Sequence, residues 1–216
     1  MAEAPTLHPP TVASSTRAPM RVSKLRVPVS HVAAVERRRL LNVLASSADV
    51  PVVLISASAG YGKSTLAAQW AARCPRPAVW LNVDRGDNDP VVLLTYLVHA
   101  VQQLGPVTRE LSDELSSPAP RVDDVVLPVL AQELERLSPF ELILDDLEEL
   151  TQPRGLAVVD FLVEEIPPGS QIVLTTRSGP DLPLTRRRVA GMLLEIRADK
   201  LALDAEETRD LAAGGG

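Results

Sequence analysis

Five short apolar runs are spaced along the chain, and longer amphipathic segments separate them. The runs are rich in Val, Ile and Leu, which is typical of strands buried on both faces of a parallel sheet. Strands that alternate with helices are the pattern of an α/β fold, so one parallel sheet covered by helices is predicted. The predicted strands are 52–55, 78–83, 141–146, 171–176 and 192–196.

The segments between the strands are predicted to be helices from the spacing of their apolar residues. Asp89 and Pro90 are a typical N-cap and first-turn pair for one of them. Pro128 stands inside another, over 121–137, and should kink or split it because proline lacks an N–H group. The other predicted helices are 35–44, 66–72, 156–166 and 205–213, the last capped by Asp204. Residues 23–28 are predicted to be an extended lead-in, and Trp80 in the second strand is predicted to be a core residue.

Composition indicates one domain of ordinary size that is not a general nucleic-acid binder. The 216 residues are 45% hydrophobic, which suffices for a core, and the net charge of −6 argues against direct binding of DNA. No apolar run approaches the length of a membrane span, and a lone Cys74 fits a reducing compartment, so we expect a cytoplasmic protein. We predict a disordered tail rich in Pro, Ala and Ser over 1–22 and a single domain over 23–213.

The stretch 57–65, ASAGYGKST, follows the first predicted strand and precedes a predicted helix. This is the context of a phosphate-binding loop, whose backbone N–H groups converge on a phosphate chain. Lys63 is expected to reach the terminal phosphates, and the Ser64 hydroxyl is expected to bind Mg²⁺. The first glycine of the usual motif is Ala57 here, which weakens a bare match. The predicted phosphate contacts are Ala59, Gly60, Tyr61, Gly62, Lys63, Ser64 and Thr65.

Two acids, Asp145 and Asp146, end the third predicted strand. The carboxyl ends of parallel strands meet at the sheet edge where ligands bind in open α/β folds. We therefore expect Asp145 to hold Mg²⁺ opposite Ser64, and Asp146 to orient or deprotonate an attacking water. Taken alone, a strand that ends in a polar turn is common. Glu148 and Glu149, which follow, are predicted to be solvated, although either could replace Asp146 as the base.

Arg177 follows the fourth predicted strand, again at the carboxyl edge. A guanidinium group there can face the γ-phosphate of a nucleotide and respond to its presence. The alternative is an ordinary surface arginine after a strand. Further along, three consecutive arginines over 186–188 are interpreted as a solvated face.

Four segments stand in the order of a known family. They are ASAGYGKSTL at 57–66, VWLNVDRGDNDP at 79–90, LILDDL at 142–147 and IVLTTRS at 172–178. Together they resemble the nucleotide-binding domain of the large ATP-dependent LuxR-type transcription activators, the maltose-regulon-activator-like regulators. These proteins belong to the signal-transduction ATPases with numerous domains, the STAND class, and their domain is AAA-like. The resemblance extends from about Ser23 onward, and alanine is usual at the first loop position.

The resemblance implies a P-loop NTPase fold, a three-layer sandwich with a five-stranded parallel sheet of order 5-1-4-3-2. In that order the strand before Arg177 lies between the phosphate-loop strand and the carboxylate strand. The implied cofactors are ATP or ADP and Mg²⁺, with Lys63 on the β- and γ-phosphates and with Ser64 and Asp145 on the metal.

The resemblance also assigns roles to three further residues. Asp146 is the implied catalytic carboxylate and Arg177 the implied γ-phosphate sensor. Arg37 falls where the family has an arginine near the adenine pocket, although Val35 and Glu36 before it depart from the usual Val-Pro. At most slow ATP hydrolysis is implied, together with self-association in the ATP state.

Members of the family continue with a winged-helix domain, a helical-repeat sensor and a helix-turn-helix, none of which fits in this chain. We expect either a truncated product or a stand-alone remnant, with weakened retention of ADP. Two alternatives to a nucleotide switch stay open. One is a P-loop kinase of a small metabolite, with 181–188 as its lid. The other is a non-catalytic interaction module that has lost its nucleotide site.

Overall fold

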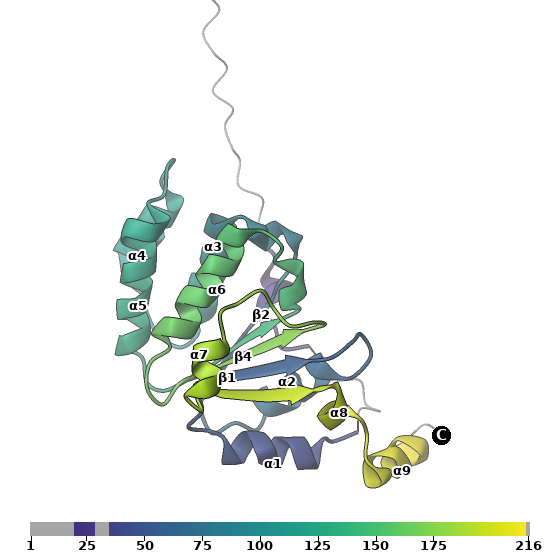
Figure 1. The fold of residues 1–216 in the computed structure, drawn as a ribbon. Coiled ribbons are helices and arrows are strands. Elements are labelled where there is room, and N and C mark those ends of the chain that lie inside the picture. The colour runs from purple at the N-terminus through teal and green to yellow at the C-terminus, as the bar shows by residue number, and fades with distance from the viewer. Residues whose placement is uncertain (1–19, 29–34, 215–216) are drawn as a thin grey trace, which may run out of the picture.

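Five parallel strands form the central sheet, in the order β2-β3-β4-β1-β5 (Figure 1). The computed structural model describes residues 20–28 and 35–214, so the tail predicted over 1–22 lies almost entirely outside the described residues. The strand order is the predicted order read from the other edge, and the predicted fold class is confirmed. The strands are β1 Val52–Ser56, β2 Ala78–Asn82, β3 Glu141–Asp145, β4 Gln171–Thr176 and β5 Leu193–Arg197.

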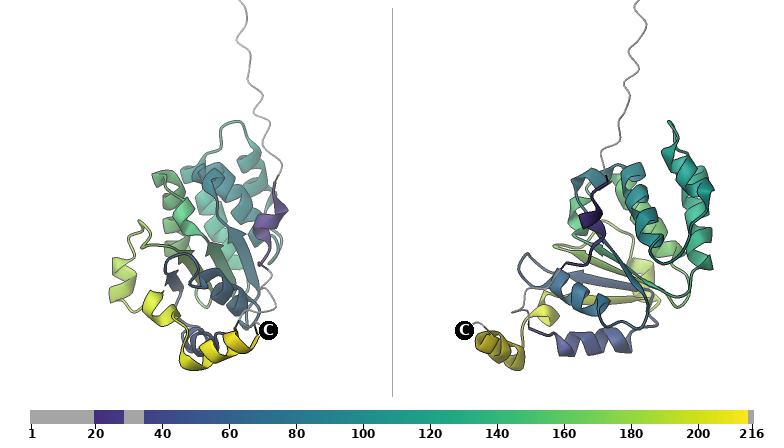
Figure 2. Two further views of the ribbon diagram at one scale, coloured as in Figure 1. Left: turned by 90° about the vertical axis from the view of Figure 1, so that its right-hand side faces the viewer. Right: turned by 180° about the vertical axis from the view of Figure 1, so that it is seen from behind.

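Helices cover both faces of the sheet and complete three layers (Figure 2). One face carries α1 and α2, and the other carries α3 and α6, with α4 and α5 beside them. The helices are α1 Arg38–Ser46, α2 Lys63–Ala71, α3 Pro90–Val101, α4 Arg109–Ser116, α5 Leu127–Arg136, α6 Pro153–Glu165, α7 Thr185–Val189, α8 Ala198–Leu201 and α9 Ala205–Gly214. Short 3-10 turns are η1 Val22–Leu25, η2 Arg85–Asn88 and η4 Leu147–Glu149, and η3 Val122–Val126 is a π-helical turn.

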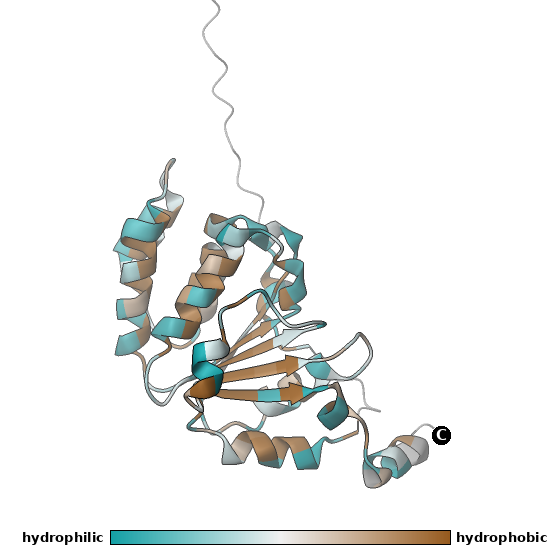
Figure 3. Ribbon diagram, viewed as in Figure 1, coloured by the Kyte–Doolittle hydropathy of each residue, from teal (hydrophilic) through white to brown (hydrophobic). Residues whose placement is uncertain are grey.

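The alternation of strand residues explains the two layers, because successive side chains of a strand point to opposite faces of the sheet. In β1, Val52 and Leu54 belong to the core under α3 and α6, whereas Val53 and Ile55 belong to the core under α1 and α2. The strands are therefore apolar on both faces, as the brown arrows between the two helix layers show (Figure 3). Trp80, predicted to be a core residue, is buried in the α1–α2 layer.

The register brings three loops to one edge of the sheet. β4 lies between β1 and β3, and Ser56 at the end of β1 pairs with Thr176 at the end of β4. Because all strands are parallel, the segments that follow β1, β3 and β4 leave the sheet at the same edge. The predicted position of the fourth strand, between the phosphate-loop strand and the carboxylate strand, is confirmed.

Local signals around α3 and α5 behave as the sequence indicates. Asp89 caps α3, with its carboxylate accepting hydrogen bonds from the N–H groups of Val91 and Val92. The helix predicted over 121–137 is split into η3 and α5. Pro128 is the second residue of α5 and comes directly after the π-helical turn, so its missing N–H falls where the hydrogen-bond pattern of the helix changes.

Two local predictions are wrong. The arginine run is not wholly solvated, since Arg187 is buried and pairs with Glu164 of α6 at 3.3 Å. The reason is that the short α7 packs its central residue toward α6. The lead-in predicted as extended over 23–28 begins instead with η1, because Lys24 turns inward to pair with Asp87. No described helix is both long enough and apolar enough to cross a membrane.

Candidate functional site

The loop between β1 and α2 turns at two glycines. Gly60 has a φ of +84° and Gly62 a φ of +81°, conformations that side chains with a Cβ rarely adopt. Gly62 is the N-cap of α2 and brings no capping side chain, so nothing from that position competes for the N–H groups of the first turn. Ala57 does not have a positive φ, and its N–H donates to the Thr176 carbonyl at 3.2 Å. Alanine at the first motif position therefore introduces no strain.

Lys63 opens α2 and is only 6% exposed. Its ammonium Nζ donates to the Ser58 carbonyl at 3.3 Å, which is its one hydrogen bond within 20–28 and 35–214. An ammonium group has three donors, and a buried one is costly to leave underused unless an anion is close. The charge of Lys63 acts on Asp145 and Asp146, and it lowers the pKa of both against the larger effect of burial. Lys63 is thus placed to receive an anionic ligand oxygen.

Ser64 and Asp145 meet at the carboxyl edge. The Ser64 hydroxyl Oγ donates to Asp145 Oδ1 at 2.9 Å, and the Thr175 hydroxyl of β4 donates to the same oxygen. Asp145 is buried, and burial raises its pKa above the usual range, while the hydrogen bonds from Thr175 and Ser64 oppose that effect. A hydroxyl and a carboxylate oxygen that meet beside a phosphate loop are the hard ligands that Mg²⁺ prefers.

Asp146 has an unusual backbone. Its φ of +60° is the one positive φ of a non-glycine residue in the part of the chain that the structure describes. Its N–H donates to Thr175 Oγ1 at 3.1 Å, so the same threonine orients both acids. Burial raises the pKa of Asp146, and the neighbouring Asp145 and Glu148 raise it further. Strained backbone of this kind is common at functional sites.

Arg177 lies at the same edge and is held by Glu148. Its Nε is 2.6 Å from Glu148 Oε1, and its backbone N–H donates to Glu148 Oε2 at 3.1 Å. The prediction that Glu148 is solvated is wrong, because the side chain is 14% exposed and engaged in this pair. The η4 turn after Asp146 directs Glu148 back toward the end of β4. Arg177 itself stays largely exposed, so its guanidinium is accessible from the solvent side of the loop.

A cavity of about 360 Å³ opens beside the phosphate loop. Arg37 forms part of its wall and is almost fully buried. The backbone N–H of Arg37 donates to Gln69 of α2, at 2.9 Å, which ties the segment before α1 to the helix after the loop. The full lining is Val35, Arg37, Gly60, Tyr61, Gly62, Thr65, Leu201, Ala202, Leu203 and Leu211.

Several residues at the site were not predicted from the sequence. Thr175 orients both carboxylates, and the signal for it was a polar residue near the end of a buried strand. Glu207 pairs with Arg37 at 3.1 Å, and the residues 201–203 and 211 line the cavity. The available signal was the pattern Asp204-x-x-Glu207, which forms a capping box at the start of α9.

The residues present fit a magnesium nucleotide. The loop is open beside Gly60, since a Cβ built there would meet nothing within 4 Å. Over the described ranges, no group of three or more His, Cys, Asp or Glu side chains could hold a metal by itself. A metal bound by Ser64 and Asp145 would need further oxygen ligands, which phosphate and water can supply.

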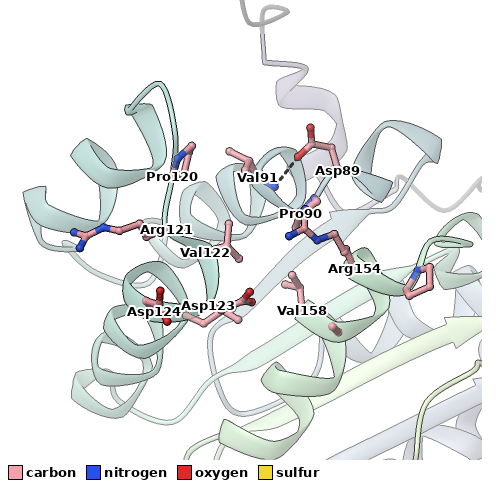
Figure 4. Close-up of a pocket in the computed structure, with 13 residues that line it drawn as sticks. Asp89, Pro90, Val91, Pro120, Arg121, Val122, Asp123, Asp124, Arg154 and Val158 are labelled. Carbon is pink, nitrogen blue, oxygen red and sulfur yellow. Dashed lines mark hydrogen bonds between the residues drawn. The ribbon is translucent and has the colours of Figure 1, made fainter.

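A second cavity, of about 790 Å³, lies away from these residues (Figure 4). It is formed by the first turns of α3 and α6 and by the π-helical turn η3. Its lining includes prolines and valines beside charged side chains such as Asp123 and Arg154. None of the lining residues belongs to the phosphate loop or to the carboxylate pair, so we do not assign the nucleotide to this cavity.

Comparison with known proteins gives relatives over most of this chain. The chain is 31% identical over 204 residues to serine/threonine-protein kinase PknK of Mycobacterium tuberculosis H37Rv. It is 30% identical over 190 residues to HTH-type transcriptional regulator MalT of Vibrio cholerae and 32% identical over 191 residues to MalT of Cronobacter sakazakii. These matches cover 91%, 86% and 87% of this chain, but only 18%, 21% and 21% of the relatives. The chain thus spans about a fifth of the length of the curated relatives that it matches.

Protein-family models and solved structures were also compared with the chain. No protein-family model matches the chain. Among solved structures, Orc1 of Aeropyrum pernix in complex with DNA is similar with a TM-score of 0.49 and 20% identity, over 87% of this chain and 50% of that one. The relationship seen in the curated proteins confirms the resemblance that the four motifs indicated: the chain is a relative of the MalT-like regulators, over a segment equal to about a fifth of their length.

Proposed function

We propose that the chain binds ATP and ADP with Mg²⁺ at the carboxyl edge of its sheet, and that it serves as the nucleotide-dependent switch domain of a transcriptional regulator. Lys63 binds the β- and γ-phosphates, and the N–H groups of the loop 59–65 surround them. Ser64 and Asp145 hold Mg²⁺, which when bound neutralises phosphate charge. Hydrolysis is slow at most.

One observation carries this proposal. A buried ammonium group, Lys63, stands in a loop with two left-handed glycines, next to a hydroxyl–carboxylate pair at 2.9 Å. Each feature alone has a structural explanation. Their meeting at one sheet edge combines the cation, the backbone donors and the metal ligands that a nucleoside triphosphate requires.

The same edge offers a means of distinguishing ATP from ADP. Arg177 is largely exposed, and its guanidinium pairs with the carboxylate of Glu148. A γ-phosphate competes with Glu148 for the guanidinium, whereas ADP has no such group. A contact made with one nucleotide and not with the other is what a two-state switch needs. Asp146, whose pKa is raised, is the candidate for orienting or deprotonating the attacking water.

The regulatory part of the proposal follows from the relatives. MalT is an HTH-type transcriptional regulator, and the segment shared with it contains the phosphate loop and the carboxylates. Direct DNA contact is not proposed for this chain, whose net charge is −6. We propose a cytoplasmic location and self-association in the ATP state on the same family basis.

A thermal-shift titration with Mg·ATP, Mg·ADP and Mg·GTP tests the proposal. A ligand at 100 times its dissociation constant adds about 2.7 kcal/mol to the folded state. For a chain of this length that is a rise in Tm of about 5–10 °C. Adenine nucleotides should give this rise with the native chain and with Lys200→Ala, which removes an exposed lysine. Lys63→Ala should abolish it. An unchanged Tm in a cooperatively folded native chain would refute the proposal.

A further inference from the structure

An ion pair joins the two ends of the described chain beside the loop cavity. Arg37, just before α1, pairs through Nε with Glu207 Oε1 of α9 at 3.1 Å, although 170 residues separate them. Both side chains are nearly fully buried, with 5% and 7% exposed. The other carboxylate oxygen of Glu207 accepts the N–H of Asp204 at 3.1 Å, which fixes the carboxylate at the start of α9.

The remaining donors of Arg37 divide between the exit segment and the cavity. Nη2 donates to the carbonyl of Leu201 at 2.5 Å and to that of Ala202 at 3.4 Å. Nη1 donates to no residue in the described part of the chain. It lies 3.6 Å from the point that a Cβ on Gly62 would occupy, so it borders the phosphate loop. The guanidinium is thus held from one side by the exit segment and faces the loop with its free edge.

The cavity in front of this guanidinium is suited to a planar base. Three of the exposed large apolar side chains of the structure line it, namely Tyr61, Leu203 and Leu211. Aromatic and aliphatic walls favour a flat heterocycle, and a guanidinium edge supplies N–H donors for ring nitrogens or stacks on the ring. Its volume of about 360 Å³ accommodates a purine.

We infer that Glu207 is a positioning residue for recognition of the nucleobase. It holds Arg37 at the back of the cavity, and the base then contacts Arg37 and the apolar walls that the exit segment provides. This inference rests on the proposed nucleotide binding. It adds that the base is bound only while α9 is docked, and therefore that base occupancy stabilises docked α9, because linkage between two sites is reciprocal.

The test separates base from phosphate. Dissociation constants for Mg·ATP and for Mg·tripolyphosphate, which lacks base and ribose, are measured by calorimetry with the native chain, Glu207→Gln and Glu207→Ala. Glu207→Gln keeps the size of the side chain and one acceptor oxygen. We expect it to weaken Mg·ATP about tenfold, the order expected when a charge-assisted contact becomes neutral, and Glu207→Ala to weaken it further. Mg·tripolyphosphate should bind all three within about twofold.

The control is Asp210→Asn, which removes an exposed carboxylate from the same helix and should leave both constants unchanged. A second readout is amide hydrogen exchange over 201–211 in the native chain. Mg·ADP should protect this segment, and Mg·tripolyphosphate should not.

Four results can be told apart, and the first three count against the inference. If Glu207→Gln lowers the affinities for Mg·ATP and for Mg·tripolyphosphate equally, Glu207 supports the loop rather than the base, and the inference is wrong. If it weakens neither, the pair is irrelevant to binding. If the native chain binds Mg·tripolyphosphate but gains nothing from the base, the inference fails while the phosphate site stands. If the native chain binds neither, the proposed function itself fails.

Discussion

The Ser64 hydroxyl donates to the Asp145 carboxylate at 2.9 Å across 81 residues of sequence. This bond joins the first turn of α2 to the end of β3, over the end of β4 between them. It couples the phosphate loop to a carboxylate whose pKa is raised by burial. The protein keeps an acid at this edge at a cost to its own stability, which is a mark of functional sites.

Replacing Asp145 with Asn is expected to stabilise the free chain and to impair binding. A raised folded-state pKa means that ionising Asp145 is harder in the folded chain than in the unfolded one. Stability is therefore lost as the pH rises from the unfolded pKa through the folded pKa, and above that range the loss is complete. The Tm of Asp145→Asn should exceed that of the native chain at pH 7, and the difference should shrink toward pH 4.

The same variant should lose at least about tenfold in affinity for ATP when Mg²⁺ is present and little when it is chelated. Asp160→Asn is the matched control, because burial also raises the pKa of that carboxyl but it lies on α6, away from the loop. It should leave nucleotide binding unchanged. A native chain more stable than Asp145→Asn at pH 7 would contradict this account.

The pair of Arg177 and Glu148 leads to a prediction about the relative affinities for ATP and ADP. Arg177→Ala should lower the affinity for ATP about tenfold and should change the affinity for ADP by no more than about twofold, since only ATP has a γ-phosphate for the guanidinium. Glu148→Gln removes the competing carboxylate charge and should raise the affinity for ATP relative to that for ADP. Competition titrations with a fluorescent nucleotide measure both ratios. Equal effects of Arg177→Ala on the two nucleotides would rule out a sensing role.

Alanine substitutions at two glycines with positive φ distinguish a loss of stability from a loss of nucleotide binding. Gly62→Ala and Gly191→Ala place a Cβ at φ of +81° and +71°, and each should lower the free energy of unfolding by about 1–2 kcal/mol. Neither Cβ meets an atom closer than 3.6 Å, so the loss comes from the backbone in both cases. Denaturant unfolding should show similar losses of stability for the two variants, but only Gly62→Ala should lower the affinity for nucleotide. Normal ATP affinity in Gly62→Ala would mean that the loop does not contact phosphate.

Cys74 offers a chemical probe of folding. Burial, with a smaller contribution from Glu141, raises the pKa of this thiol to about 11. At pH 8 only about 0.1% of it is then thiolate, so alkylation should be about two orders of magnitude slower than for an exposed cysteine. Iodoacetamide labelling followed by mass spectrometry measures this, with the denatured chain as reference. Equal rates in the native and denatured chains would show that the helix end around Cys74 is open.

The sequence predicts the strands and the position of the loop because these depend on local patterns. Val52–Ser56 is apolar on both faces, and Lys63 and Ser64 follow it at fixed spacing. The order of the strands is known only through the family resemblance. Glycines, proline and capping residues act within a few positions of themselves, so Asp89 and Pro128 also behave as predicted.

Charged side chains are where prediction from the sequence fails. The sequence predicts solvated side chains for Arg187 and Glu148 and no role for Glu207. Each of the three is largely buried and pairs with a residue from a distant element. Their burial depends on which helices meet in space, and no local pattern encodes that. Thr175 shows the same limit, because its role arises only when β4 lies beside Asp145.

Amide hydrogen exchange with and without Mg·ATP tests the central claim most directly, because it locates the nucleotide. Mg·ATP should slow amide exchange over 57–66 and over 145–148, and it should leave exchange of the strand-core amides of β2 unchanged. Lys63→Ala should abolish the protection. Protection confined to the cavity between α3, α6 and η3, with the loop 57–66 unaffected, would contradict the assignment of the nucleotide to the phosphate loop.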